Sequence, residues 1–115
     1  MKKKRKNFIH IFIRKYQKNN YLKYMRKTCL DTVYELAKED KKVLFIGSDL
    51  GPGVLNDFKK NIPERFFMEG VSEQSIIGLS AGLAMEGFKP YVNTIATFIT
   101  RRCFEQVAID LCMHN

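Results

Sequence analysis

The regular pattern of apolar and polar positions begins with a helix over residues 26–40. Apolar side chains recur there at i, i+4, i+7 and i+8, which places them on one stripe of a helix: Cys29, Val33, Leu36 and Ala37. Residues 41–48 follow as a short apolar run without alternation. Such a run is typical of a strand buried on both faces of a parallel sheet.

The middle of the chain alternates between short elements. The Gly-Pro-Gly sequence within residues 49–53 predicts a turn, and residues 54–60 fit one or two helical turns. Residues 65–68 read as a second short strand. A helix is then expected over residues 73–86, with Ser72 as a candidate N-cap and Gly87 as its C-terminal stop. This helix is rich in small residues and nearly free of charge, so we expect it to be buried and closely packed.

A third strand over residues 89–95 and a helix over residues 98–113 complete the pattern. Pro90 is tolerated because it stands at the start of its strand. Helices that alternate with strands predict an α/β fold with three layers and a parallel sheet. The sequence ends where a further strand is expected, so the predicted domain, residues 26–115, reads as incomplete.

Charge is distributed unevenly along the 115 residues, whose net charge is +8. Residues 1–27 carry 11 Lys and Arg and no acid, whereas residues 28–115 carry 9 Lys and Arg and all 12 acids. The basic character therefore belongs to a tail. We expect residues 1–25 to be a disordered extension, with Met25 as an alternative start; a transit peptide is the other interpretation, although serine is absent there.

The cysteines and the lengths of the apolar runs limit the cellular compartments and the metal sites that the sequence allows. No run approaches the ~20 apolar residues of a membrane span, and no secretory signal is recognisable. The odd count of three cysteines favours free thiols in a reducing compartment, and hence the cytoplasm. Cys103 and Cys112 match no zinc spacing, and the chain has only two His, so no metal site is expected.

Ligands of open parallel sheets bind beyond the carboxyl ends of the strands. Three loops qualify in this sequence: residues 48–53, 69–73 and 94–98. A Ser/His/Asp triad is excluded, because His10 lies in the tail and His114 at the terminus. The glycines of the first loop also lack the spacing of a phosphate-binding fingerprint.

Four motifs in order resemble the pyrimidine-binding domain of the transketolase family. The first is Gly47-Ser48-Asp49-Leu50, after the first strand. The second runs from Phe66 to Gln74 and the third is the Gly/Ala-rich stretch 78–84. The last runs from Thr97 to Gln106. The resemblance covers residues 26–115 and implies the thiamine-diphosphate-binding fold in its pyrimidine module.

The resemblance implies that Glu73 is the catalytic carboxyl group. In this family the corresponding glutamate hydrogen-bonds ring nitrogen N1′ of the aminopyrimidine of thiamine diphosphate. A proton shared there favours the imino tautomer, whose 4′-nitrogen removes the C2 proton of the thiazolium. Burial would favour the protonated carboxyl and a helix N-terminus the ionised one. An acid placed in a first helical turn for the dipole is the alternative role.

Other site residues follow from the same resemblance. Phe98 is expected to stack on the pyrimidine ring, with a core aromatic at the start of a helix as the alternative. Asp49 and Leu50 are expected to contact the cofactor, although Asp49 could equally form the turn. Arg101 and Arg102 are candidates for a sugar phosphate, with solvated or interface arginines as the alternative.

The family's Gly-Asp-Gly motif, which marks the Mg²⁺ and diphosphate site, does not occur in this sequence. The resemblance therefore implies that a partner subunit or domain holds Mg²⁺ and the diphosphate, in a homo- or hetero-oligomer. The expected activity is transfer of a two-carbon ketol unit between sugar phosphates, with no turnover by this chain alone.

Two kinds of alternative remain open. Within the wider thiamine family, a deoxyxylulose phosphate synthase or the β chain of a 2-oxoacid dehydrogenase shares the glutamate and much of the fold. In a different class, a small protein could bind nucleic acid or an acidic membrane surface through its basic tail. We disfavour nucleic acid, because the positive charge is confined to the tail.

Overall fold

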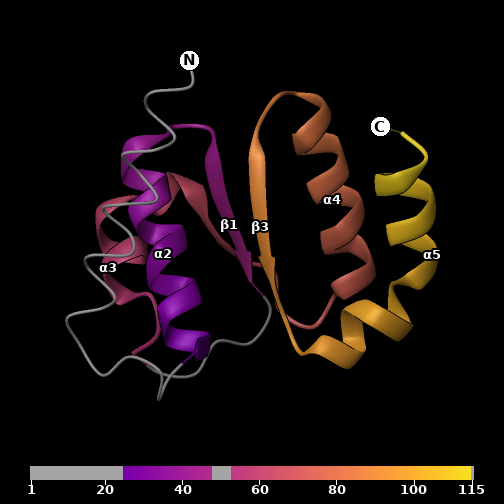
Figure 1. Cartoon of the computed structure of the whole chain (residues 1–115), viewed down its shortest axis with the longest axis horizontal. Coiled ribbons are helices and arrows are strands. Elements are labelled where there is room, and N and C mark those ends of the chain that lie inside the picture. Colours follow the sequence, from indigo (N-terminus) through magenta and orange to yellow (C-terminus); the bar gives the residue numbers. More distant parts are fainter. Residues whose placement is uncertain (1–24, 48–52, 115) are drawn as a thin grey trace.

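The computed structural model describes residues 25–47 and 53–114. A parallel sheet of three strands lies between helices, with strand order β2-β1-β3 (Figure 1). Helices α2 (Met25–Glu39) and α3 (Asn56–Asn61) lie on one side, and α4 (Glu73–Met85) lies on the other with the C-terminal helical segments. Parallel strands require crossover connections, and helices supply them here. The predicted α/β class with a parallel sheet is confirmed.

Strand β1 (Val43–Gly47) is central, and all five of its residues are buried. It pairs with β2 (Phe66–Met68) through Phe45 and Phe66, and with β3 (Lys89–Asn93) through Phe45 and Tyr91. An apolar run without alternation suits this position, because both faces of the strand are covered by helices. The prediction of a strand buried on both faces is confirmed.

The core on the α2 side is built around aromatic rings. Phe45 stacks on Phe66 with 5.2 Å between ring centroids, and Phe58 packs at 5.6 Å from Phe66. Helix α2 contributes its buried face to this cluster: Leu30, Val33 and Ala37. The predicted stripe is wrong at one position: Cys29 is exposed, and Leu30 lies in the core instead. The three buried residues stand at i, i+3 and i+7, so the stripe keeps helical spacing and begins at Leu30.

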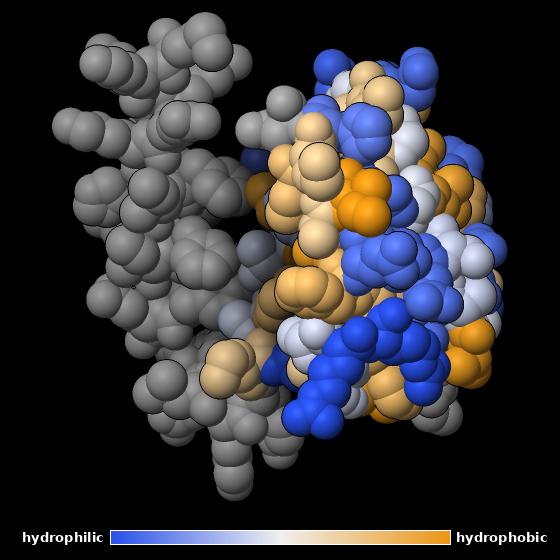
Figure 2. Space-filling model, turned by 90° about the vertical axis from the view of Figure 1, so that its right-hand side faces the viewer, coloured by the Kyte–Doolittle hydropathy of each residue, from blue (hydrophilic) through white to orange (hydrophobic). Residues whose placement is uncertain are grey.

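Helix α4 corrects another prediction, since it is not buried on all sides. Its buried face carries Ile76, Ile77, Ser80 and Ala81, whereas Leu79 and Met85 are exposed. Figure 2, which faces the side of α4 and α5, shows hydrophobic residues interspersed with hydrophilic ones on that surface. The low charge of the helix therefore reflects one covered face and one exposed apolar face.

The helix predicted over residues 98–113 is interrupted. A wide turn, η3 (Phe98–Arg102), is followed by α5 (Phe104–Gln106) and by a second wide stretch, η4 (Val107–Cys112). The backbone N–H of Cys103 donates to the carbonyl of Phe98, five residues back, over 3.1 Å. This bond closes a π-type turn.

The turns at both ends of α4 match the sequence expectations in part. Gly87 has φ +84°, a left-handed conformation that ends the helix, as predicted. Ser72 occupies the N-cap position, but its hydroxyl donates to the carbonyl of Glu69 over 2.8 Å rather than capping the helix. In the part of the chain that the structure describes, no helix is long and apolar enough to cross a membrane.

Candidate active site at the start of helix α4

The candidate site lies at the carboxyl ends of the strands. Glu73 opens α4, after the loop that follows β2, and the wide turn η3 follows β3. Because β2 and β3 flank the same central strand and run parallel, the segments that follow them meet at one edge of the sheet (Figure 1). The predicted site residues Glu73, Phe98 and Arg102 thus come together from segments that are far apart in the sequence.

Glu73 is the most deeply buried acid of the site. Its side chain is 2% exposed, and Arg102 Nη1 donates to Glu73 Oε2 over 2.9 Å. A buried carboxylate needs a positive partner or hydrogen-bond donors to offset the loss of hydration. Arg102 supplies that charge, and its own side chain remains 46% exposed. The pair therefore joins a buried acid to a half-exposed base.

Arg102 also lies over an aromatic ring. Its Cζ is 4.1 Å from the centroid of the Phe98 ring, within the range of a cation–π contact. The main chain of Arg102 is held too, because Gln74 Nε2 donates to its carbonyl over 3.1 Å. The guanidinium is thus in contact with both Phe98 and Glu73.

Cys103 directly follows Arg102 and is buried. Its side chain is fully buried, and burial raises the pKa of its thiol, with a further contribution from the negative charge of Glu73. A thiol held neutral in this way is a weak nucleophile. Cys103 therefore acts here as a small apolar packing group.

The other predicted site residues are less informative. Arg101 is exposed on the neighbouring position of the wide turn. Asp49 and Leu50 lie outside the described residues, so their contacts with a cofactor stay predictions. The same holds for sugar-phosphate binding by Arg101 and Arg102. The pairing of Arg102 with Glu73 was missed, because nothing in the sequence marks a π-type turn.

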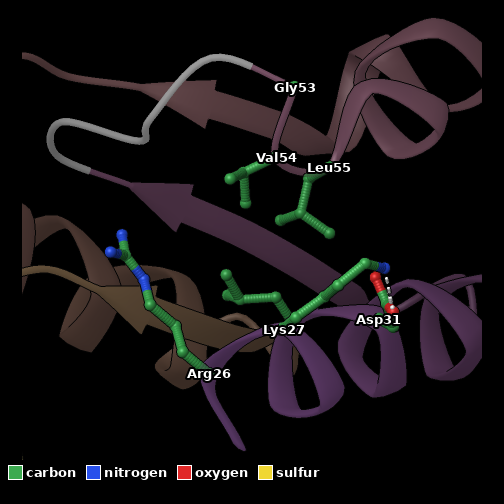
Figure 3. A pocket seen from close by; sticks show the side chains of 7 residues that line it. Arg26, Lys27, Asp31, Gly53, Val54 and Leu55 are labelled. Atoms are coloured by element: carbon green, nitrogen blue, oxygen red, sulfur yellow. Dashed lines mark hydrogen bonds and ion pairs between the residues drawn. The ribbon is translucent and has the colours of Figure 1, made fainter. Parts of the chain in front are cut away.

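A separate pocket of about 290 Å³ lies beside the first turns of α2 (Figure 3). Figure 3 shows Val54 and Leu55 pointing toward α2, where Lys27 pairs with Asp31 at 2.7 Å. Leu55 has φ 55°, an uncommon left-handed conformation for a branched residue. The lining shares no residue with the Glu73 site: Arg26, Lys27, Leu30, Asp31, Gly53, Val54 and Leu55.

The described residues offer no metal-binding cluster. Among residues 25–47 and 53–114, no group of three or more His, Cys, Asp or Glu side chains is arranged to hold a metal ion. The site as described therefore consists of one carboxyl group, one guanidinium and one aromatic ring.

The chain is similar to known proteins. A 1-deoxy-D-xylulose-5-phosphate synthase of Clostridium perfringens (strain SM101 / Type A) is 38% identical over 104 residues, covering 90% of this chain and 16% of that protein. One of the subunits of an apulose-4-phosphate transketolase, from Phocaeicola vulgatus, is 42% identical over 87 residues, covering 75% of this chain and 28% of that protein. The chain thus spans less than a third of either relative.

A solved structure agrees with these relatives. A chain described as "Split gene transketolase, inactive beta4 tetramer" superposes with a TM-score of 0.70 at 34% identity, over 77% of this chain and 30% of that one. Residues 23–115 also match the family described as the transketolase pyrimidine-binding domain. The chain therefore belongs to the pyrimidine-binding domain family of transketolases, which are thiamine diphosphate-dependent enzymes.

Proposed function

We propose that this chain is the pyrimidine-binding part of a transketolase-type enzyme that transfers a two-carbon ketol unit between sugar phosphates. The observation that carries the proposal is the buried Glu73 at the start of α4, in contact with Arg102, which itself lies over Phe98. A carboxyl group with an aromatic ring close by suits the recognition of a planar, nitrogen-containing ring. Family membership makes that ring the aminopyrimidine of thiamine diphosphate.

The residues present fit this cofactor. The guanidinium of Arg102, which contacts Glu73 and Phe98, is itself a planar group with nitrogen atoms at its edge. Glu73 would hold or share a proton with ring nitrogen N1′, and Phe98 would cover one face of the ring. Thiamine diphosphate supplies the nucleophilic carbon on which such transfers depend. Burial of Glu73 keeps water away from the shared proton.

The diphosphate and Mg²⁺ are assigned to a partner in this proposal. The carboxyl-rich set that Mg²⁺ prefers does not occur among the described residues. One relative is named as a subunit of a transketolase, and the solved structure is named as a split-gene transketolase. Both names support an oligomer in which a second subunit binds the diphosphate. We also propose the cytoplasm as the place of action, in keeping with three free thiols.

The test of this function is the substitution E73Q, assayed with a diphosphate-binding transketolase subunit, Mg²⁺ and thiamine diphosphate. Glutamine keeps the shape of the side chain but cannot hold or share the proton, so ketol transfer should fall by about 100-fold or more. The matched control is E69Q, because Glu69 lies shortly before Glu73 and is exposed. Wild-type ketol transfer by E73Q would contradict the proposal.

A second candidate is favoured by several relatives that are named 1-deoxy-D-xylulose-5-phosphate synthases. The same Glu73 would serve that reaction. The reaction product distinguishes the transketolase from the synthase. The synthase would form 1-deoxyxylulose 5-phosphate in the same reconstituted assay.

A further inference from the structure

Access to Glu73 is the feature that leads beyond the proposed function. With its side chain 2% exposed, Glu73 offers no open surface on which a ring nitrogen could dock. One group that contacts its carboxylate is the side chain of Arg102, which is itself half exposed. A half-exposed arginine can adopt other rotamers at a small cost, whereas the buried neighbours of Glu73 on α4 are fixed by packing.

The contacts of Arg102 coincide with those proposed for the cofactor ring. A guanidinium is planar, carries N–H donors at its edge and stacks on aromatic faces. An aminopyrimidine is also planar, with a ring nitrogen and an amino group at its edge. Arg102 donates to Glu73 at 2.9 Å and lies over Phe98 at 4.1 Å. These are the two contacts that the proposed function assigns to the aminopyrimidine.

We propose that the guanidinium of Arg102 is an internal ligand that occupies the aminopyrimidine position, and that it must swing out before the ring can reach Glu73. This inference rests on the proposed function of the site. The backbone of Arg102 stays in place during this movement, because Gln74 holds its carbonyl and the π-type turn holds the preceding residues. Only the side chain exchanges, so the site opens without unfolding of η3.

The internal ligand has a consequence for affinity. A site that is closed part of the time binds its ligand more weakly, by the fraction of molecules that are open. It also supplies a positive charge to the buried carboxylate while the cofactor is absent, which offsets part of the cost of burying that charge. Arg102 therefore weakens binding of the cofactor and stabilises the site while the cofactor is absent.

The experiment measures thiamine binding to the full 115-residue chain by calorimetry. Thiamine carries the aminopyrimidine without the diphosphate, so the probe does not depend on a diphosphate-binding partner. We compare wild type with R102M, which removes the hydrogen-bonding edge but keeps much of the length of the side chain. The matched control is K59M, because Lys59 is an exposed cation on α3, on the opposite side of the sheet from α4. E73Q in both backgrounds tests whether binding occurs at this site.

We expect R102M to bind thiamine about threefold to tenfold more tightly than wild type, since the closed state is removed. K59M should bind as wild type does, and E73Q should abolish binding in both backgrounds. Equal or weaker binding by R102M, with binding still dependent on Glu73, would overturn the internal ligand and leave the proposed function intact. Absence of any binding that depends on Glu73 would contradict the proposed function, and the internal ligand with it.

R102M removes the cation that neutralises a buried carboxylate and could for that reason fail to fold. A second measurement therefore uses the wild-type chain alone. Nitrogen-detected NMR of the arginine side chains should show a hydrogen-bonded Arg102 guanidinium that loses this signature as thiamine is added. A guanidinium signal that stays unchanged at saturating thiamine would rule out displacement.

Discussion

Gly47 ends the central strand at a point where the backbone leaves no room for a side chain. A Cβ at this position would lie 2.8 Å from Met68 Sδ and 2.8 Å from the ring of Phe45. Met68 is partly exposed and can move, but Phe45 is 1% exposed and is held in the aromatic core. A larger residue at position 47 would therefore have to displace the buried ring of Phe45, which destabilises the folded state.

We expect G47A to lower the free energy of unfolding by about 1–3 kcal/mol, as overpacking of a core usually does. Urea unfolding followed by circular dichroism measures this change. The matched control is G82A in the exposed part of α4, where a Cβ would meet nothing within 4 Å. Alanine should stabilise the helix there by about 0.5–1 kcal/mol. Equal effects of the two substitutions would contradict the close approach at Gly47.

The residues of the site were predictable to different degrees. Glu73 and Phe98 were identified from sequence motifs, and the structure brings both beside Arg102. The ion pair itself could not be predicted, because it depends on a five-residue turn closed from Cys103 to Phe98. A five-residue turn and an ordinary α-helical turn can carry the same side chains. The periodicity of a sequence does not distinguish the two turns.

Among the elements, the start of β3 is tied to the turn between α2 and β1. Lys89 Nζ lies 2.8 Å from Asp40 Oδ2, and the backbone N–H of Lys42 donates to Asp40 Oδ1 over 2.8 Å. The bond from Lys89, and then that from Lys42, hold the pKa of Asp40 below its ordinary value of 3.8. This tie lies at the edge of the sheet opposite the candidate site.

The lowered pKa of Asp40 predicts a pH dependence of stability. The folded state favours the ionised carboxylate, so its contribution is present above pH 3.8 and is lost as the pH falls through the lower pKa of the folded state. D40N should have a lower free energy of unfolding than wild type at neutral pH. The difference between the two proteins should become smaller as the pH is lowered into the acidic range. Urea unfolding at neutral and at acidic pH measures it.

The control for this pair is E39Q, because Glu39 is the exposed neighbour at the end of α2. We expect no comparable closing of the difference for E39Q. A constant difference between D40N and wild type from neutral pH into acid would show that the carboxylate charge of Asp40 does not matter.

Helix α4 illustrates what composition can and cannot predict about an element. Its existence, its first residue and its glycine stop agree with the sequence pattern. Its burial was overestimated, since a scarcity of charge indicates contact with something apolar but not on how many faces. Leu79 at 44% exposed and Met85 at 71% exposed lie on the face that the sheet does not cover.

At the scale of the whole molecule, the uneven distribution of charge allows two functions to be tested separately: polyanion binding by the basic tail and thiamine binding at the Glu73 site. Residues 1–24 hold much of the positive charge and no acid, and α2 begins at Met25. A chain of residues 25–115 should bind a heparin column far more weakly, because affinity for a polyanion depends on the number of neutralised charges. The salt concentration at elution measures this loss.

The circular dichroism spectrum serves as the control, and it should be retained when the tail is removed. Thiamine binding should survive as well if the function resides in the Glu73 site. Loss of thiamine binding together with heparin binding would favour a function located in the basic tail.

The strand order β2-β1-β3 has a consequence for how the molecule is made on the ribosome. The central strand leaves the exit tunnel before either of its neighbours. Its five residues, which are buried in the folded domain, therefore stay unpaired until the neighbouring strands have been translated. Pairing with β3 requires the chain to be synthesised through Asn93, and Arg102 follows only after that. During translation, Glu73 thus emerges well before the arginine that neutralises it. The ion pair that covers this buried acid can therefore form only after residue 102 has been translated.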